Sequence, residues 1–510
     1  MESLAPAVPS EKKDIAFEKI QSHLDLFHTR HGQAYAVDLI NGTGEILPLR
    51  SRKFRQLVMK RYYDITGKLP SGFVITSMIH LMEIKALDGR EEAVFSRLGA
   101  IGGNIYINLA NEAREQVLIT REHLQIIPAT QSAARFLPAP SSLPLVRPNL
   151  EGDLGRILPF LNVENQEHAI LIIAWLVMAL SNKGPYPILN IQGEQGTGKS
   201  CLCRLLRNLI DPASPALENF PRSERDLLIS ASNGHLLAYD NLSGVSHTMS
   251  DILCRLSTGG GQSVRQLYSD NEEIKFDVIK PVLVNGITDL FTRQDVCDRA
   301  IIVKTSVIPP HKRLPEIELQ KAWEAAKPEI LGGLYRAVAT ALRNLETIQL
   351  DSYPRMADFV KFIVAAEPAL PWQPRAFLQA YDNNRMGIIE DAIEADPVAK
   401  ALEKLIQIYP AGWLGTPSDL LIALNQCTTE DIRRMKIWPK LPNSLSGKLN
   451  RCATFMRARN IHISFGKSAG QRFISIHPSI PAAQVAPPLA PALMLLPPLP
   501  EQSVSHAQVA

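Results

Sequence analysis

Residues 193–200, GEQGTGKS, restrict the fold of this chain more than any other segment. They fit the pattern GxxxxGK[ST], in which glycines let the backbone curl so that its N–H groups converge on a phosphate. An apolar run at 186–192 precedes the loop, and a helical pattern at 200–210 follows it and ends before Asp211-Pro212. A helix N-terminus favours negative charge. The segment therefore predicts a strand, a phosphate-binding loop and a helix in succession.

The residue types of the loop predict an ATP-binding P-loop NTPase that uses Mg²⁺. Lys199 would place a point charge on the β- and γ-phosphates, and the hydroxyl of Ser200 would ligate the metal. A glycine turn without a ligand is the alternative reading. We expect the nucleotide to contact the whole loop and the residue after it: Gly193, Glu194, Gln195, Gly196, Thr197, Gly198, Lys199, Ser200 and Cys201.

Further polar residues stand at the ends of apolar runs downstream of the loop. The run at 236–239 ends in Asp240, where a P-loop NTPase needs a carboxylate, so we assign Mg²⁺ to Ser200 and Asp240. The run at 282–284 ends in Asn285, which could orient the attacking water beside the γ-phosphate, although Asn is also a common turn former. Such ends meet at one edge of a parallel sheet.

The length and pattern of the chain predict several folded units. A chain of 510 residues exceeds one compact core, and short apolar runs that alternate with helical patterns from 150 to 345 indicate a parallel α/β sheet. Pro-rich sequence separates this segment from the N-terminal one. We predict an N-terminal α+β domain at 1–135, a linker at 136–149, an ATPase core at 150–345, a helical segment at 346–395, a basic domain at 396–478 and an Ala/Pro-rich disordered tail at 479–510.

Composition excludes several other classes of protein. With 45% hydrophobic and 21% charged residues, the chain is typical of soluble globular proteins. Six cysteines without CxxC pairs argue against a disulfide framework or zinc module and favour a reducing cytoplasm. The first residues show no secretion signal, and the apolar segment at 169–180 is too short to span a bilayer. We therefore expect a cytoplasmic protein without a membrane partner.

Taken together, the loop at 193–200, Asp240, Asn285 and the pair Asp298-Arg299 resemble the superfamily 3 helicases. Within them the chain is most similar to the ATPase half of primase-helicases of phages and mobile elements, over residues 150–345 by motif. The resemblance implies an AAA+-like core in a hexameric ring around DNA, with Asn285 as sensor. It also implies that Arg299 is a trans-acting arginine finger, with Arg293 as the second choice. From the residues alone, an Asp-Arg pair such as Asp298-Arg299 is more often a local ion pair than a catalytic arginine.

Two stretches near these motifs bear on how the protein would act. The resemblance implies a DNA-contacting hairpin in the ring channel at 258–275, where Arg265, Tyr268 and Lys275 could meet phosphates and bases; a plain surface hairpin is the alternative. The family also has a second acid after the Walker B aspartate, whereas this chain has Asn241. Asp240 would serve both roles, another acid such as Glu194 or Asp226 would act, or hydrolysis is slow.

The segment at 431–476 is strongly basic and contains one acid, Asp431. A helix at 444–459 has an apolar stripe of Leu445, Leu449, Cys452 and Met456, and a hairpin with its turn at 466–470 follows it. Helix and hairpin in this order predict a winged helix, although a solvated basic helix is the alternative. The residues expected to contact DNA are Lys448, Arg451, Arg459 and Lys467.

The helix expected at 52–63 is also basic, with a core stripe of Phe54, Leu57, Val58 and Tyr62. The N-terminal segment is too short for a full primase with a zinc module and lacks the cysteines, so if the chain is a replication protein, another chain would do the priming. These features predict an ATP-dependent DNA helicase or replication-initiator ATPase of a phage or mobile element. It would act as a ring on single-stranded or fork DNA. Binding to duplex origin DNA is a further possibility that the sequence does not decide. The alternatives are an ATPase that remodels a protein–DNA complex without unwinding and a winged-helix regulator switched by ATP.

Overall fold

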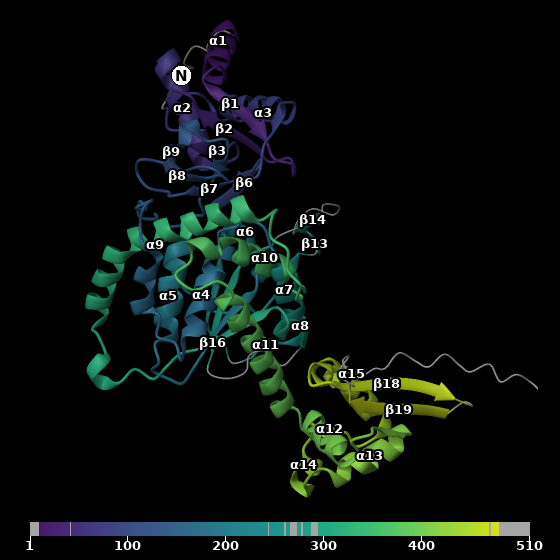
Figure 1. The fold of residues 1–510 in the computed structure, drawn as a ribbon. Coiled ribbons are helices and arrows are strands. Elements are labelled where there is room, and N and C mark those ends of the chain that lie inside the picture. The colour runs from purple at the N-terminus through teal and green to yellow at the C-terminus, as the bar shows by residue number, and fades with distance from the viewer. Residues whose placement is uncertain are drawn as a thin grey trace, which may run out of the picture. The chain divides into compact units, whose positions relative to one another are not determined.

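The computed structural model describes residues 10–40, 42–242, 244–259, 262–265, 273–276, 279–286, 294–468 and 471–478. The chain forms two compact units, Met1–Ile388 and Ile389–Ala510, which are treated separately below (Figure 1). Tyr268 and Arg293 lie outside the described residues, as does the segment 479–510 for which we predicted disorder.

The first unit begins with helices and two small sheets. One sheet has the order β3-β2-β1-β4 and packs against α1–α3, whereas the other is the antiparallel meander β6-β7-β8-β9. A short parallel pair, β5 and β10, accompanies them. The elements are α1 (Ser10–Gln21), β1 (Leu24–His28), β2 (Ala34–Asp38), β3 (Ile46–Pro48), α2 (Arg52–Thr66), α3 (Gly72–Leu87), β4 (Arg90–Glu91), β5 (Val94–Phe95), β6 (Leu98–Ile101), β7 (Asn104–Asn108), β8 (Glu115–Ile119), β9 (Leu124–Pro128) and β10 (Arg135–Phe136).

Helix α2 shows why the sequence folds in this way. The side chain of Ser51 accepts a hydrogen bond from the N–H of Phe54, and Gly67 ends the helix at a φ of 67°. Phe54, Val58 and Tyr62 of the predicted core stripe are buried, and Leu57 is half-buried against the same cluster. Arg61, on the same helix, is buried as well and forms an ion pair with Asp38 of β2.

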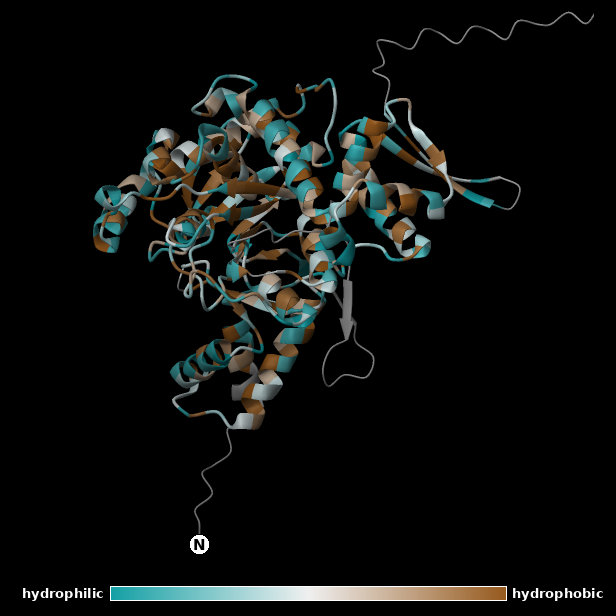
Figure 2. Ribbon diagram, turned by 90° about the horizontal axis from the view of Figure 1, so that it is seen from below, coloured by the Kyte–Doolittle hydropathy of each residue, from teal (hydrophilic) through white to brown (hydrophobic). Residues whose placement is uncertain are grey.

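A four-stranded parallel sheet forms the centre of the first unit, in the order β12-β15-β11-β16. Its strands are β11 (Ile188–Gln192), β12 (Leu237–Leu242), β15 (Val282–Gly286) and β16 (Ala300–Lys304). Two hydrophobic clusters pack on its faces, one with α4 (Gln166–Ala179) and α5 (Lys199–Ile210), the other with α6 (Glu224–Asn233) and α7 (His247–Thr258). Figure 2 shows hydrophobic residues along the central strands. The predicted mixed α/β fold with a parallel sheet is confirmed.

Both edge strands of this sheet have partners. Glu218 forms a parallel bridge with Tyr239 beside β12. On β16, the side-chain amide of Asn384 accepts from the N–H of Ile302 at 3.2 Å and donates to its carbonyl at 2.6 Å. These contacts cover backbone groups that would otherwise be unpaired.

Further helices follow: α8 (Gln294–Cys297), α9 (Glu316–Asn344), α10 (Ala357–Ala366) and α11 (Ala376–Ala395), whose last residues belong to the second unit. Short 3-10 helices span Ala129–Gln131, Leu154–Phe160, Pro310–Lys312 and Glu367–Ala369. Helix α4 is buried from Ala169 to Ala179 and contains most of the apolar segment at 169–180. Among the helices of the described ranges, none combines the length and hydropathy of a membrane span.

In the residues that the structure describes, the second unit contains the end of α11, the helices α12–α15 and a three-stranded sheet in the order β17-β19-β18. The predicted basic helix is α15, and its stripe of Leu445, Leu449, Cys452 and Met456 is buried as expected. The hairpin strands extend further toward the turn than we predicted, and β17 was not predicted. The elements are α12 (Pro397–Ile408), β17 (Trp413–Gly415), α13 (Pro417–Gln426), α14 (Glu430–Arg434), α15 (Pro442–Ala458), β18 (Ile461–Ser468) and β19 (Gln471–Pro478).

Candidate nucleotide site

The loop between β11 and α5 depends on glycines. Gly193, Gly196 and Gly198 have φ angles of 154°, 83° and 82°, which side chains other than hydrogen rarely allow. A Cβ on Gly193 would lie 2.2 Å from the Oγ1 of Thr305, at the end of β16. Gly198 is the N-cap of α5, so the loop leads directly into the N-terminus of that helix. Backbone N–H groups at a helix start attract anions.

The side chain of Lys199 lies against the loop. Its ammonium donates to the carbonyls of Gly193 at 2.8 Å and Glu194 at 2.7 Å. Thr197 is buried, and its hydroxyl donates to the same Glu194 carbonyl at 2.9 Å. These contacts hold a positive charge beside the curled backbone.

Three predicted residues from separate segments come together at the start of α5. The hydroxyl of Ser200 donates to Oδ1 of Asp240 at 2.8 Å, and Nδ2 of Asn285 donates to the same oxygen at 2.7 Å. The Oδ1 of Asn285 in turn accepts from the N–H of Asn241 at 2.8 Å. The register between β12 and β15 shifts between Tyr239 and Leu242, so the carboxylate stands at a bulge. A hydroxyl and a carboxylate at this distance are oxygen ligands of the kind that Mg²⁺ prefers.

Two cysteines flank this cluster. Cys203 is fully buried, and its Sγ accepts a hydrogen bond from Asn285 at 3.3 Å. Burial raises the pKa of the Cys203 thiol to about 12, so it stays protonated at neutral pH. Burial also raises the pKa of Cys201, which follows the loop. Neither thiol is therefore poised as a nucleophile.

Sequence patterns did not identify two residues that hold the loop in place. Thr305 donates its hydroxyl to Oγ1 of Thr197 at 2.7 Å, and Asn162 donates its amide to the carbonyls of Thr197 at 3.0 Å and Ser306 at 2.7 Å. Both come from segments distant in sequence and lack a motif. The isolated bridge between Val163 and Thr305, which aligns these segments, depends on tertiary structure.

A cavity of about 420 Å³ adjoins the loop on the side of β16. Gln192 is 6% exposed, and its Nε2 has no hydrogen-bond partner within the described residues. A buried donor of this kind is costly unless a water or ligand satisfies it. The lining residues are Glu164, Gln192, Gly193, Glu194, Lys304, Thr305, Ser306 and Val307.

Arg299 does not join the cluster within one chain. Arg299 directly precedes β16, and its backbone carbonyl accepts a hydrogen bond from the N–H of Ile188 at the start of β11. It therefore lies at the N-terminal ends of the strands, whereas the loop lies at their C-terminal ends. The four residue steps along β16 separate these two ends by about 13 Å. Its Nη1 donates to the carbonyl of Asp295 at 2.7 Å. Asp298 forms its ion pair with Arg355 at 2.7 Å.

Asn241, Asp226 and Glu194, the residues that bear on how the attacking water is activated, differ in their surroundings. Asn241 has a φ of 52°, a conformation that Asn tolerates better than most residues. Asp226 accepts the hydroxyl of Ser223 at 2.6 Å at the start of α6, which gives it a capping role. Glu194 is exposed on the loop. We found no cluster of three or more His, Cys, Asp or Glu suited to a metal ion in the part of the chain that the structure describes.

Two of the three predicted DNA contacts of the first unit lie on a pair of antiparallel strands. Arg265 ends β13 (Gln262–Arg265), and Lys275 belongs to β14 (Glu273–Phe276). In the register of this pair, Arg265 is opposite Glu273 and Ser263 is opposite Lys275.

The predicted contacts of the second unit differ from one another. Arg451 is exposed and Lys448 half-buried on α15, outside the buried stripe. Lys467, near the end of β18, is exposed and directly opposite Arg472 of β19. Like charges opposite each other destabilise a hairpin, so an anion there would be favourable. Arg459 instead pairs with Glu390 at 3.1 Å and Glu403 at 3.9 Å.

Comparisons with known proteins identify a family. Residues 154–384 match the actinomycete integrative conjugative element replication protein, and residues 398–488 match the C-terminal domain of the same protein, RepA. Together the two matches cover more than half of the chain. No curated protein matches the sequence.

Solved structures provide a more distant likeness. An apo structure of the NrS-1 C-terminal region, in its A form, has 13% identity and a TM-score of 0.41 over 91% of this chain and 99% of that one. A second, of NrS-1 residues 305–718, has 11% identity and the same TM-score over 92% and 100%. Likeness at these TM-scores is too low to support a conclusion.

Proposed function

Because the chain belongs to the replication proteins of actinomycete integrative conjugative elements, we propose that it is an ATPase that drives replication of the element's DNA. The observation that carries this proposal is the contact of Ser200, Asp240 and Asn285 at the N-terminus of α5, behind the glycine loop. Hydroxyl, carboxylate and amide converge where a triphosphate would meet the helix start. This convergence supports a P-loop NTPase site.

The residues present fit ATP and Mg²⁺. Ser200 and Asp240 would hold the metal, which when bound neutralises charge on the β- and γ-phosphates. Lys199 already lies on the loop and needs only to turn from two carbonyls to phosphate oxygens. Asn285 would orient the attacking water by turning one amide hydrogen from Asp240 or Cys203 to the water. The cavity beside Gln192 has room and an unpaired donor for the nucleoside end.

A catalytic role for Arg299 would require a ring. Its guanidinium lies at the sheet edge opposite the loop of its own chain, so catalysis by Arg299 would require a neighbouring subunit. We therefore propose an arginine finger that acts in trans within a homo-hexamer. This is the assembly implied by the superfamily 3 resemblance.

DNA contact is proposed for both units. The strand pair β13–β14 would face DNA in the ring channel through Arg265 and Lys275. In the second unit, α15 and the following hairpin would form a winged helix, with Lys448 and Arg451 on the helix and Lys467 on the wing. A separate primase would supply primers.

A second function is favoured by Asn241. It takes the place of a water-polarising acid, and its backbone N–H binds the sensor Asn285. An amide cannot accept a proton from water. ATP would then act mainly as a switch for assembly on DNA, with slow hydrolysis.

A fork-unwinding assay with the purified full chain separates these functions. ATP, a non-hydrolysable ATP analogue and no nucleotide are compared on the same labelled fork. Strand separation with ATP alone supports the motor. DNA binding that both nucleotides raise, without strand separation, supports the switch. DNA binding and unwinding that are independent of all nucleotides would contradict both.

A further inference from the structure

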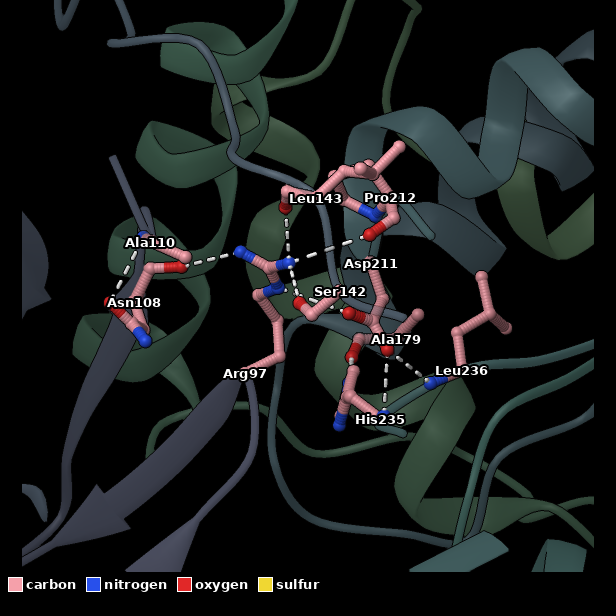
Figure 3. A network of polar contacts seen from close by, with 10 residues as sticks. All are labelled: Arg97, Asn108, Ala110, Ser142, Leu143, Ala179, Asp211, Pro212, His235 and Leu236. Atoms are coloured by element: carbon pink, nitrogen blue, oxygen red, sulfur yellow. Dashed lines mark hydrogen bonds and ion pairs between the residues drawn. The ribbon is translucent and has the colours of Figure 1, made fainter. Parts of the chain in front are cut away.

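A buried arginine of the N-terminal part of the first unit contacts the end of α5 (Figure 3). Arg97, just before β6, has a side chain that is 1% exposed and donates through Nε to Oδ1 of Asp211 at 3.0 Å. Asp211 is the residue that follows α5. The remaining guanidinium bonds go to Asn108, Leu143, Pro212 and Ser142.

Asp211 uses its second oxygen to hold the start of β12. Its Oδ2 accepts from the N–H groups of His235 at 2.8 Å and Leu236 at 3.3 Å, directly before the strand begins at Leu237. Burial opposes ionisation of Asp211, but the charge and hydrogen bond of Arg97 and the backbone N–H of His235 lower its pKa below the usual range. One carboxylate thus joins the end of α5 to the beginning of β12.

The same helix and strand meet again at the nucleotide site. Ser200, in the first turn of α5, contacts Asp240 of β12 at 2.8 Å. The 12 residues of α5 separate the two contacts by about 18 Å. The helix and strand are therefore tied at both ends, once by the proposed metal ligands and once by the pair that Arg97 completes.

The Pro-rich connector strengthens this second tie. The N–H of Leu143 donates to the carbonyl of Pro212 at 2.8 Å, and the N–H of Ser214 donates to the carbonyl of Ser141 at 2.9 Å. Arg97 also donates to the Leu143 carbonyl at 2.6 Å. The guanidinium thus lies where the N-terminal part, the connector and the α5 end meet.

We propose that Arg97 is a positioning residue for the nucleotide site: by fixing Asp211, it sets the spacing of α5 and β12 and hence of Ser200 and Asp240. This rests on the proposed ATPase function. Loss of the guanidinium leaves Asp211 buried without its cation, so the carboxylate must move toward water or take up a proton. Either change loosens the strand start and shifts the metal ligands.

The test uses the full chain with Arg97→Met, Arg97→Lys and the double variant Arg97→Met/Asp211→Asn. Measurements are kcat and KM for ATP and the Mg²⁺ concentration for half-maximal turnover. A small misplacement caused by a change far from the reacting groups can cost about 10²-fold, so we expect Arg97→Met to lower kcat or raise the Mg²⁺ requirement by up to about that factor, with KM little changed. Arg97→Lys and the double variant should recover part of the loss.

Arg61→Met is the matched control because Arg61 forms a buried pair with Asp38 that contacts neither α5 nor β12. It should lower the thermal midpoint and leave kcat and the Mg²⁺ requirement unchanged. Equal kinetic effects of the two arginine variants, or normal kinetics in folded Arg97→Met, would overturn the proposal. If Arg97→Met does not fold, the kcat, KM and Mg²⁺ requirement of Arg97→Lys and of the double variant test the proposal instead. Absence of turnover in the wild type would instead count against the ATPase function.

Discussion

Buried polar residues of the first unit have specific hydrogen-bond partners, and His235 is an example. His235 is 4% exposed, and its Nε2 lies 2.7 Å from the carbonyl of Ala179. Burial, reinforced by the charge of Lys280, lowers the pKa of His235 to about 4. The ring is therefore neutral at pH 7, and because its partner is a carbonyl, the proton is on Nε2.

This environment predicts an acid-sensitive contribution to stability. The unfolded His has a pKa of about 6.5, so between about pH 6.5 and 4 the unfolded chain binds the proton that the folded chain excludes. The free energy of unfolding should fall as pH decreases through this window, by up to about 3 kcal/mol. In His235→Gln, which retains an N–H donor, urea unfolding measured from pH 7 to 4 should show a smaller fall. An identical fall in both proteins would exclude His235 as the cause.

Among the elements, strands and helices with a strong periodic pattern were predictable, whereas contacts between distant segments were not. The central strands and α5 follow from apolar runs around the glycine loop, and the stripe of α15 follows from its helical spacing. Strands β1, β2 and β17 are short and lack a clear alternation, so only tertiary pairing defines them. Thr305 and Asn162 could not be predicted for the same reason, because their hydrogen bonds to the loop form only when segments distant in sequence pack side by side. The location of Arg299 at the far sheet edge required the register of β16.

Helix α15 provides a prediction about DNA affinity. Lys448 and Arg451 lie outside its buried stripe, and each phosphate contact contributes about 0.9 to the slope of log affinity against log salt. Lys448→Ala/Arg451→Ala should therefore reduce that slope by about 2, measured by fluorescence anisotropy on duplex DNA. Lys404→Ala, an exposed change on α12, serves as control. An unchanged slope in the double variant would argue against α15 as a DNA-reading helix.

For the whole molecule, the proposed ring makes activity a property of neighbouring subunits. Arg299→Ala should bind ATP almost normally, hydrolyse it poorly and poison wild-type subunits. A finger of this kind contributes about 10³- to 10⁵-fold, and Asn241 favours the lower end. The measurement is ATPase activity during titration of the variant into wild type. Activity should fall faster than the wild-type fraction, whereas a strictly proportional fall would contradict action in trans.

The central claim is that the loop at 193–200 forms an ATPase site, and Lys199→Ala tests it most directly. The Lys199 ammonium contacts only two loop carbonyls among its described partners, so the variant should fold normally, with an unchanged circular dichroism spectrum and thermal midpoint. Mg²⁺-dependent ATP turnover by the purified full chain should fall by at least about 10²-fold, since a charge aimed at the phosphates is lost. Wild-type turnover rates in folded Lys199→Ala would contradict the assignment of this loop as the active site.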